Sequence, residues 1–381
     1  MKRLFLLVTL TLILPTVSNA QSFEQLAQKA GDFYIKNNLP EAFKAIKAAF
    51  QLDSNKARAF DYYTAARIAA KTDHISEAFS WLYVAQRRGL GREIFYLEYV
   101  SLDDAFLHMW KDPRWEPYVK TLEQDMLKKK AEEQRRREDW KNACLRNAAA
   151  MKEGHLQAGF ALYYNKVDTL EVPYQVYVPK SINTHKKHKL IVFLHGGVVD
   201  QGYFGEDSPS MSSVVPIFQV ADSLGAIVLY PFARKDFGWW GQLAAFQNVV
   251  NITKVVTAQY PIDPKQIVMV GDATGGTALF WYATQPESLY KGYLAISATP
   301  KLEIGEIAFS QITPDKHFYS INATDDRILN YKEIHDIYSK QRSIATGWHF
   351  ETVNFGGYNI IFRNEGPPLI LKYLKKIFAE K

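Results

Sequence analysis

Four turns in the second half of the chain place polar or small residues directly after apolar runs, where side chains could be held for chemistry. The turns contain His195, Ala273, Asp326 and Tyr358. Imidazole, carboxylate and phenol groups transfer protons, and a hydroxyl beside a base attacks carbonyl carbons. Proton transfer is therefore available to these turns, whereas Ala273 carries only a methyl group and supplies no nucleophile.

The turn at Ala273 is the sharpest of the four. Three apolar residues, Val268–Val270, lead into the small residues Gly271–Gly276, and the apolar segment Thr277–Ala283 follows. This order predicts a strand, a tight turn and a helix.

Strands and helices are predicted to alternate around this turn. Apolar runs predict strands at 174–179, 190–194, 226–230, 266–270, 292–296, 317–321 and 350–355. Longer periodic segments predict helices at 214–224, 243–260, 331–342 and 367–379. The alternation is typical of an α/β fold with a doubly wound, mostly parallel sheet covered by helices on both faces.

In this region the chain resembles the α/β hydrolases of the secreted esterase type, near feruloyl esterases and prolyl-oligopeptidase-like enzymes. The resemblance runs from residue 162 to the C-terminus. It rests on Leu194–Gly197 after an early strand, on Tyr260–Ile267 before the central turn, and on the turn itself. The family implies a serine in that turn, an acid after a later strand and a histidine after the last strand.

On this resemblance, two of the three catalytic positions are substituted. Ala273 occupies the serine position, and Tyr358 in the loop Phe355–Asn359 occupies the histidine position. Asp326 matches the acid position, with Asp325 as the alternative register. Acyl transfer then lacks both a nucleophile and a proton carrier. The double substitution favours a natural pseudoenzyme, because an artificial serine-to-alanine change would leave the histidine in place.

Neighbouring residues are not expected to replace the missing groups. Asp272 and Thr274 flank the serine position, where side chains of the family point aside. The resemblance implies that His195, Gly196 and Gly197, together with the amide of Thr274, form an oxyanion pocket. The histidine could also be a relic that only holds its loop.

A pair of tryptophans, Trp239 and Trp240, lies in a loop that often borders the substrate in this family. Such rings could stack on a sugar or an aromatic acid. Packing in the core is an equally open alternative.

The first half of the chain has a helical period and a weak repeat. Glu41–Ile46 recurs 36 residues later as Glu77–Leu82 (77 − 41), each time after a break. A period of this length with small residues at helical spacing is similar to tetratricopeptide (TPR) repeats. We expect a TPR-like helical domain at 21–120, a charged helical linker at 121–153 and the α/β-hydrolase-like domain at 154–381. The helical domain could be a cap on the second domain or a groove for a partner protein.

The N-terminus has the pattern of a secretory signal peptide. Basic Met1–Arg3 precedes the apolar run Leu4–Leu14, and small residues at Ser18–Ala20 predict cleavage after residue 20. A membrane anchor is the alternative, but the apolar run is shorter than a bilayer requires. The chain is therefore expected to be secreted or periplasmic, with no membrane span after cleavage.

Charge and cysteine usage exclude several classes of function. The net charge of +6 falls to +4 without Lys2 and Arg3 and is spread along the chain, so no nucleic-acid role is inferred. Cys144 is the only cysteine, which rules out an intramolecular disulfide and a cysteine-based metal cluster. No metal or cofactor is expected.

These observations predict an exported pseudo-hydrolase that binds a small ester, a sugar, an aromatic acid or a protein. Two alternatives stay open. The protein could be an active carboxylic-ester hydrolase with a non-standard site, or a partner-binding repeat protein whose second domain is structural.

Overall fold

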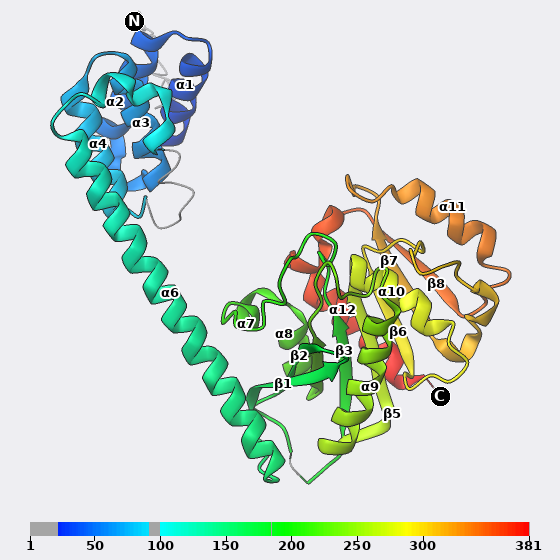
Figure 1. The fold of residues 1–381 in the computed structure, drawn as a ribbon. Helices are drawn as coiled ribbons and strands as arrows, with labels where there is room; N and C mark the ends of the chain where they lie inside the picture. Colours follow the sequence, from blue (N-terminus) through cyan, green and yellow to red (C-terminus); the bar gives the residue numbers. More distant parts are fainter. Residues whose placement is uncertain (1–21, 91–99, 184, 381) are drawn as a thin grey trace, which may run out of the picture. The chain divides into compact units, whose positions relative to one another are not determined.

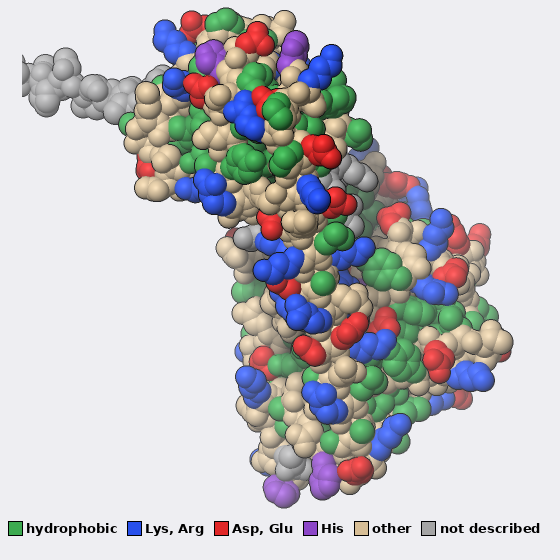
Figure 2. Space-filling model, turned by 60° about the vertical axis from the view of Figure 1, so that its left-hand side comes forward, with side chains coloured by type: hydrophobic (Ala, Val, Ile, Leu, Met, Phe, Trp, Pro, Cys, Tyr) green, Lys and Arg blue, Asp and Glu red, His purple; other side chains and the backbone are tan. Residues whose placement is uncertain are grey.

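The computed structural model describes residues 22–90, 100–183 and 185–380 (Figure 1). The chain divides into two compact units, residues 1–134 and 135–381. The predicted signal peptide lies outside the described residues. Within the described ranges, no helix combines the length and apolar character needed to cross a membrane. Figure 2 shows acidic and basic side chains interspersed over the visible face of the protein.

The first unit is built from two helical hairpins. Its helices are α1 (Phe23–Ile35), α2 (Leu39–Asp53), α3 (Ala59–Lys71) and α4 (Ile75–Arg87). Helix α3 begins 36 residues after α1 (59 − 23), and α4 begins 36 residues after α2 (75 − 39). The structural repeat therefore has the spacing of the sequence repeat. A relationship to tetratricopeptide proteins stays a prediction.

Small residues allow these helices to pack closely. Ala30, Ala42 and Ala65 come from α1, α2 and α3 and are fully buried in one cluster with Ile46 and Ile68. Because alanine adds only a methyl group, it lets helix backbones approach each other. The side chain of Ser22 accepts a hydrogen bond from the Gln25 backbone and caps α1.

A single helix, α6 (Trp115–Lys152), carries the charged run and is 38 residues long. Tyr118 and Leu122 near its start are buried in the core of the first unit. Cys144 and Ala148 near its end are buried in the two cores of the second unit. The division between the units falls inside this helix, after residue 134.

The second unit has a mixed α/β fold with an eight-stranded sheet. The strands are β1 (Gly159–Val167), β2 (Leu170–Val178), β3 (His188–Leu194), β4 (Ile227–Pro231), β5 (Ile262–Asp272), β6 (Gly292–Ile296), β7 (Phe318–Ala323) and β8 (Trp348–Val353). Their order is β1-β2-β4-β3-β5-β6-β7-β8. All pairs from β4 to β8 are parallel, whereas β1–β2 and β2–β4 are antiparallel. The prediction of a mostly parallel sheet is thus confirmed for the part that contains the candidate site.

Helices cover both faces of the sheet and bury a separate core on each. The helices of this unit after α6 are α7 (Met211–Val214), α8 (Ile217–Leu224), α9 (Leu243–Gln259), α10 (Thr274–Ala283), α11 (Tyr331–Gln341) and α12 (Gly366–Ala379). Side chains of α9 and α10 pack in one core, and side chains of α8 and α12 pack in the other. Strand β5 serves both: Met269 enters the first core, while Val268 and Val270 enter the second.

Two elements differ from the sequence-based prediction. The helix predicted over 214–224 is interrupted, because Val215 is extended (φ −86°, ψ 112°) before Pro216. A residue before proline avoids the helical region, and proline has no N–H to donate. Strand β1 was not predicted, and it extends the sheet through antiparallel pairing with β2.

Candidate functional site

The strand, turn and helix predicted around Ala273 are present. Strand β5 ends at Asp272, α10 begins at Thr274, and the residue between them has φ 51° and ψ −116°. A positive φ is strained for a residue with a side chain, and such strain concentrates at functional turns. The Ala273 N–H donates to the Ile296 carbonyl at 2.9 Å, which ties the turn to the end of β6.

Close backbone approach fixes this turn. A Cβ atom at Gly275 would collide with the carbonyl of Leu194 at the end of β3, and one at Gly271 would collide with the Gly275 backbone. Only glycine leaves room for α10 to cross the strand ends at this distance. The geometry of the turn is therefore set by main-chain packing and not by the side chain at position 273.

The loop after β3 lies directly against the turn. A Cβ atom at Gly196 would be 2.9 Å from the Ala273 methyl carbon and 3.3 Å from the Asp272 carboxylate. The Thr274 hydroxyl accepts a long hydrogen bond of 3.4 Å from the Val198 N–H. The first amides of α10 have no acceptor within the helix. The structure thus brings the loop at 195–197 together with Ala273 and Thr274, as the oxyanion interpretation requires.

His195 is held by the backbone on both sides of its ring. Nε2 accepts a hydrogen bond from the Ala233 N–H at 3.2 Å, so the proton resides on Nδ1, which donates to the Gly196 carbonyl at 2.8 Å. The removal of the ring from water lowers its pKa to about 4, so the ring is neutral near pH 7. Both nitrogens are occupied, and His195 fixes the loop without a free position for proton transfer.

The acid position lies in the loop after β7. One oxygen of Asp326, Oδ1, accepts hydrogen bonds from the backbone N–H groups of Ile328 and Leu329, each at 2.8 Å. The other, Oδ2, is buried and has no hydrogen-bond partner in the structure. Asp325, the alternative register, accepts from the Gly357 N–H at 3.0 Å. This bond joins the acid loop to the loop that carries Tyr358.

Tyr358 is half-buried among acidic groups. Burial raises the pKa of its phenol, and the negative charges of Asp272, Asp326 and Asp200 raise it further. The phenol therefore keeps its proton near pH 7. A Cβ atom at Gly357 would be 4.0 Å from the Asp326 Cα atom, and the Tyr358 phenol interacts with the charge of Asp272 beside the turn. We call Ala273, Asp272, Asp326 and Tyr358 the cluster.

Asp272 is a member of this cluster that sequence reasoning set aside. It is 7% exposed, its Oδ1 atom has no hydrogen-bond partner, and burial raises its pKa to about 8. A buried carboxyl without a partner is costly when charged, so the group holds a proton near neutral pH. The sequence indicates the burial of Asp272 in part, since an aspartate at the end of a buried strand has few ways to reach water.

The two tryptophans have different environments. Trp239 is only 1% exposed, and its indole N–H donates to the His195 carbonyl at 3.1 Å. It belongs to the core beneath the loop and has no face free for a ligand. Trp240 is half-buried. Their neighbouring positions in the sequence do not reveal this difference.

Two cavities border the cluster. One has a volume of about 400 Å³ and is lined by Asp325, Arg327, Ile328, Phe355, Gly356, Gly357, Tyr358, Asn359, Arg363 and Glu365. The other has a volume of about 260 Å³ and is lined by the edge of His195 together with aromatic residues that include Tyr203, Phe204, Tyr230 and Phe232. Space thus exists beside Tyr358 and beside His195.

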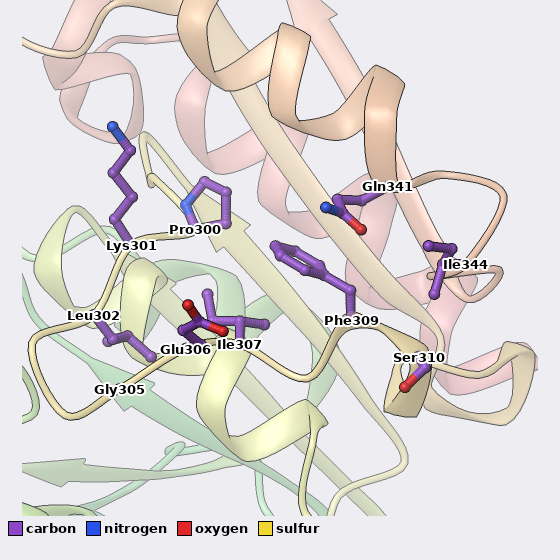
Figure 3. A pocket seen from close by; sticks show the side chains of 10 residues that line it. All are labelled: Pro300, Lys301, Leu302, Gly305, Glu306, Ile307, Phe309, Ser310, Gln341 and Ile344. Atoms are coloured by element: carbon purple, nitrogen blue, oxygen red, sulfur yellow. The ribbon is translucent and has the colours of Figure 1, made fainter.

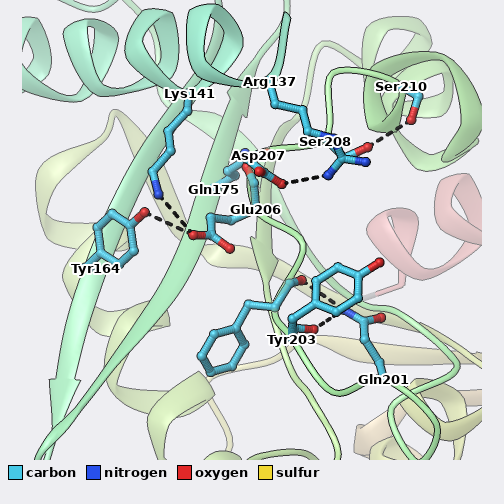
Figure 4. A network of polar contacts seen from close by, with 11 residues as sticks. Arg137, Lys141, Tyr164, Gln175, Gln201, Tyr203, Glu206, Asp207, Ser208 and Ser210 are labelled. Atoms are coloured by element: carbon cyan, nitrogen blue, oxygen red, sulfur yellow. Dashed lines mark hydrogen bonds and ion pairs between the residues drawn. The ribbon is translucent and has the colours of Figure 1, made fainter. Parts of the chain in front are cut away.

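Polar contacts from α6 fix the segment that bounds the smaller cavity (Figure 4). Lys141 and the Tyr164 hydroxyl contact the Glu206 carboxylate at 3.2 and 3.3 Å. Arg137 forms an ion pair with Asp207 at 3.1 Å. These partners are up to 70 residues apart in the chain, so no spacing in the sequence indicates them.

Among the described residues, no group of histidine, cysteine, aspartate and glutamate side chains is arranged to hold a metal ion. The carboxyl groups around Tyr358 belong to separate turns and engage backbone amides or remain buried.

Comparison with known proteins gives similarity at the level of structure only. No family model matches the sequence, and no curated protein matches it. A thermostable esterase is 20% identical, with a TM-score of 0.44 over 57% of this chain and 62% of that one. A ferulic acid esterase is 15% identical, with a TM-score of 0.46 over 58% of this chain and 98% of that one.

An S-formylglutathione hydrolase from Staphylococcus aureus is 12% identical, with a TM-score of 0.47 over 58% of this chain and 99% of that one. The chain spans less than two thirds of the thermostable esterase. At such low identity, neither substrate nor activity passes from these proteins to this chain. The strand order and the strand pairing define the fold.

Proposed function

We propose that the second unit is an α/β-hydrolase-type domain that has lost acyl-transfer chemistry and serves as a binding module. The observation that carries this proposal is Ala273, whose buried methyl group is 4% exposed in the strained turn between β5 and α10. A side chain without a heteroatom cannot attack a carbonyl carbon. Position 273 of the turn therefore offers no reactive atom.

The groups around the turn support the same proposal. A phenol whose pKa is raised, such as that of Tyr358, is a poor proton acceptor near pH 7. His195 belongs to the loop that lies against the turn, and both of its nitrogens are engaged by the backbone. Asp326 retains the acid position but has no histidine to orient.

The cavity of about 400 Å³ beside Tyr358 is of a size suited to a small ligand. We propose a small ester, a sugar or an aromatic acid as its occupant. The same proposal includes export through residues 1–20 and recruitment of a protein partner by the helical hairpins. Their support is the signal-peptide pattern and the repeat of 36 residues.

The proposal is tested by measuring hydrolysis of p-nitrophenyl acetate and a feruloyl ester, together with labelling by a fluorophosphonate probe. We expect the full chain to give no turnover above a matched blank and no labelling, because position 273 has no hydroxyl. Turnover that disappears in Asp326→Ala would instead establish an active esterase with a non-standard site.

Restoration of the missing groups is the complementary experiment. Ala273→Ser alone is expected to stay unlabelled, since no base activates the hydroxyl. The double variant Ala273→Ser with Tyr358→His is expected to gain fluorophosphonate labelling that Asp326→Ala reverses. A folded double variant that remains unlabelled would contradict the assignment of the three positions.

A further inference from the structure

The connection between β6 and β7 lacks the helix that usually joins parallel strands. All residues from 297 to 317 are described, and their only helical turns are two short 3₁₀ segments, Phe309–Gln311 and Pro314–Lys316. A crossover helix normally covers the sheet at such a connection. The preceding and following connections each have one, α10 and α11. In the β6–β7 connection, irregular chain therefore takes the place of a helix that would cover the sheet.

A cavity of about 710 Å³ lies between this connection and the end of α11 (Figure 3). It is lined by Pro300, Lys301, Leu302, Gly305, Glu306, Ile307, Phe309, Ser310, Gln341 and Ile344. The volume falls in the range of roughly 300–1,000 Å³ that small-molecule sites occupy. None of the lining residues belongs to the cluster around Ala273.

Apolar side chains form a fixed floor for the cavity. Leu302, Ile307 and Phe309 pack against the core that α9 and α10 share. The Phe309 ring stacks on Trp348 of β8, with centroids 5.7 Å apart and an interplanar angle of 12°. Ile344 stands at the rim and is 51% exposed. An apolar ligand body would contact preformed surface.

Two charged side chains line the cavity, Lys301 and Glu306. Lys301 forms an ion pair with Glu333, and Figure 3 shows its side chain directed away from Glu306. Within the described part of the chain, Glu306 forms no ion pair, and the side chains of Gln341 and Ser310 make no hydrogen bond to protein. Glu306 and Ser310 are exposed, and Gln341 is half-buried. One carboxylate and two neutral polar groups are therefore free to bind a ligand beside the apolar floor.

We propose that this cavity binds a small ligand with an apolar body and a cationic amine. The body lies on Phe309 and Ile307, and the ammonium group lies next to the Glu306 carboxylate. Gln341 and Ser310 supply further hydrogen-bond acceptors for the ammonium protons. The site is separate from the turn at Ala273, so it does not depend on whether that turn is inactive.

The test is calorimetric titration of the full chain with 4-phenylbutylamine at low salt. Matched probes are the neutral 4-phenylbutanol and the anionic 4-phenylbutyrate, which share the apolar body. We expect the amine to bind most tightly and the acid least tightly, with steps of roughly twofold to fivefold, as for other exposed charge pairs. Added salt should reduce the preference for the amine.

Two matched variants locate the site. Glu306→Gln should lower the affinity for the amine to that for the alcohol and leave the alcohol unchanged. Glu303→Gln removes a carboxylate from the same segment that does not line the cavity, and it should change neither affinity. Ile344→Trp should narrow the rim and weaken binding of all three probes, with circular dichroism to confirm folding.

Three outcomes would overturn the proposal. Absence of binding for every probe at millimolar concentration would show that the cavity is not a ligand site. Equal affinity for the amine and the acid, or an amine preference that survives in Glu306→Gln, would show that Glu306 does not select the ligand.

Discussion

The turn at Ala273 and the loop at Tyr358 both belong to the cluster, but their backbones are held in place differently. At the turn, a Cβ atom on Gly275 would collide with main-chain atoms of β3. At the loop, Gly356 and Gly357 have φ of 89° and 55°, and the chain surrounds an open cavity. The first is fixed by long-range backbone packing, and the second by local dihedral angles and one bond to Asp325.

This difference determines how each segment tolerates substitution. Because the main chain alone determines the turn, exchange of the side chain at 273 leaves β5 and α10 in place. The loop at Tyr358 is not packed against a distant strand in this way, so other side chains could replace those that line its cavity. We therefore expect large effects on stability from substitution of the glycines at the turn and modest effects from substitution of the glycines at the loop.

The largest effect is predicted for Gly275→Ala. The added methyl group would force α10 away from the end of β3, at a cost of about 3 kcal/mol in the free energy of unfolding. Urea denaturation followed by fluorescence measures this loss. Gly202→Ala is the control, since a Cβ atom there meets nothing within 4 Å, and it should change stability by less than about 0.5 kcal/mol. Equal losses of stability in the two variants would show that close packing against β3 does not constrain Gly275.

The second prediction concerns the proton on Asp272. Burial raises its pKa to about 8 from a usual value of 3.8. Between these values the unfolded chain has released a proton that the folded chain retains. The free energy of unfolding therefore falls as the pH rises, by up to about 1.4 kcal/mol per pH unit, and the fall ends above about pH 8.

His195 acts in the opposite direction over part of this range. Its pKa is lowered to about 4 from 6.5, so below 6.5 the unfolded chain binds a proton that the folded chain does not. The two effects oppose each other from about pH 4 to 6.5, and only the fall remains from 6.5 to 8. Asp272→Asn should abolish that fall in urea titrations at several pH values. A variant whose stability still falls from pH 6.5 to 8 as in the parent would disprove the assignment.

The smallest effect is predicted for the loop. Gly357→Ala introduces a side chain at φ 55°, where its Cβ atom would meet only ordinary contacts, the nearest at 3.5 Å. The left-handed conformation alone should cost about 1 kcal/mol. Gly357→Asn should cost less, because asparagine tolerates this region. A loss as large as that of Gly275→Ala would show that the loop is packed as tightly as the turn.

The sequence predicts the central sheet well because its strands are buried on both faces. The apolar run at 292–296 coincides with β6, and the periodic segment at 331–342 ends one residue after α11. Strand β1 has no comparable pattern, since four successive buried residues are followed by a mainly exposed half. Its pairing with β2 depends on contacts that no local pattern specifies.

The site was predictable where the main chain determines it. The glycines around residue 273 indicate the turn, and their spacing led to the position after β5. The burial of Trp239 could not be read in the same way, because it depends on contact with a distant segment, as its hydrogen bond to the His195 carbonyl shows. The ion pair between Arg137 and Asp207 likewise joins segments 70 residues apart. The cavity between the β6–β7 connection and α11 had one indirect sign in the sequence. Pro300 and Pro314 disfavour a helix in that connection.

The crossing of α10 over the end of β3 has a practical consequence for reading genomes. Gly271 and Gly275 are demanded by the clearance between two main chains, whatever side chain stands between them. A sequence search that scores those glycines identifies proteins with this backbone turn. It does not distinguish proteins with a nucleophile in the turn from proteins without one. For protein engineers, the same clearance means that a side chain introduced at position 273 would be held by a rigid main chain.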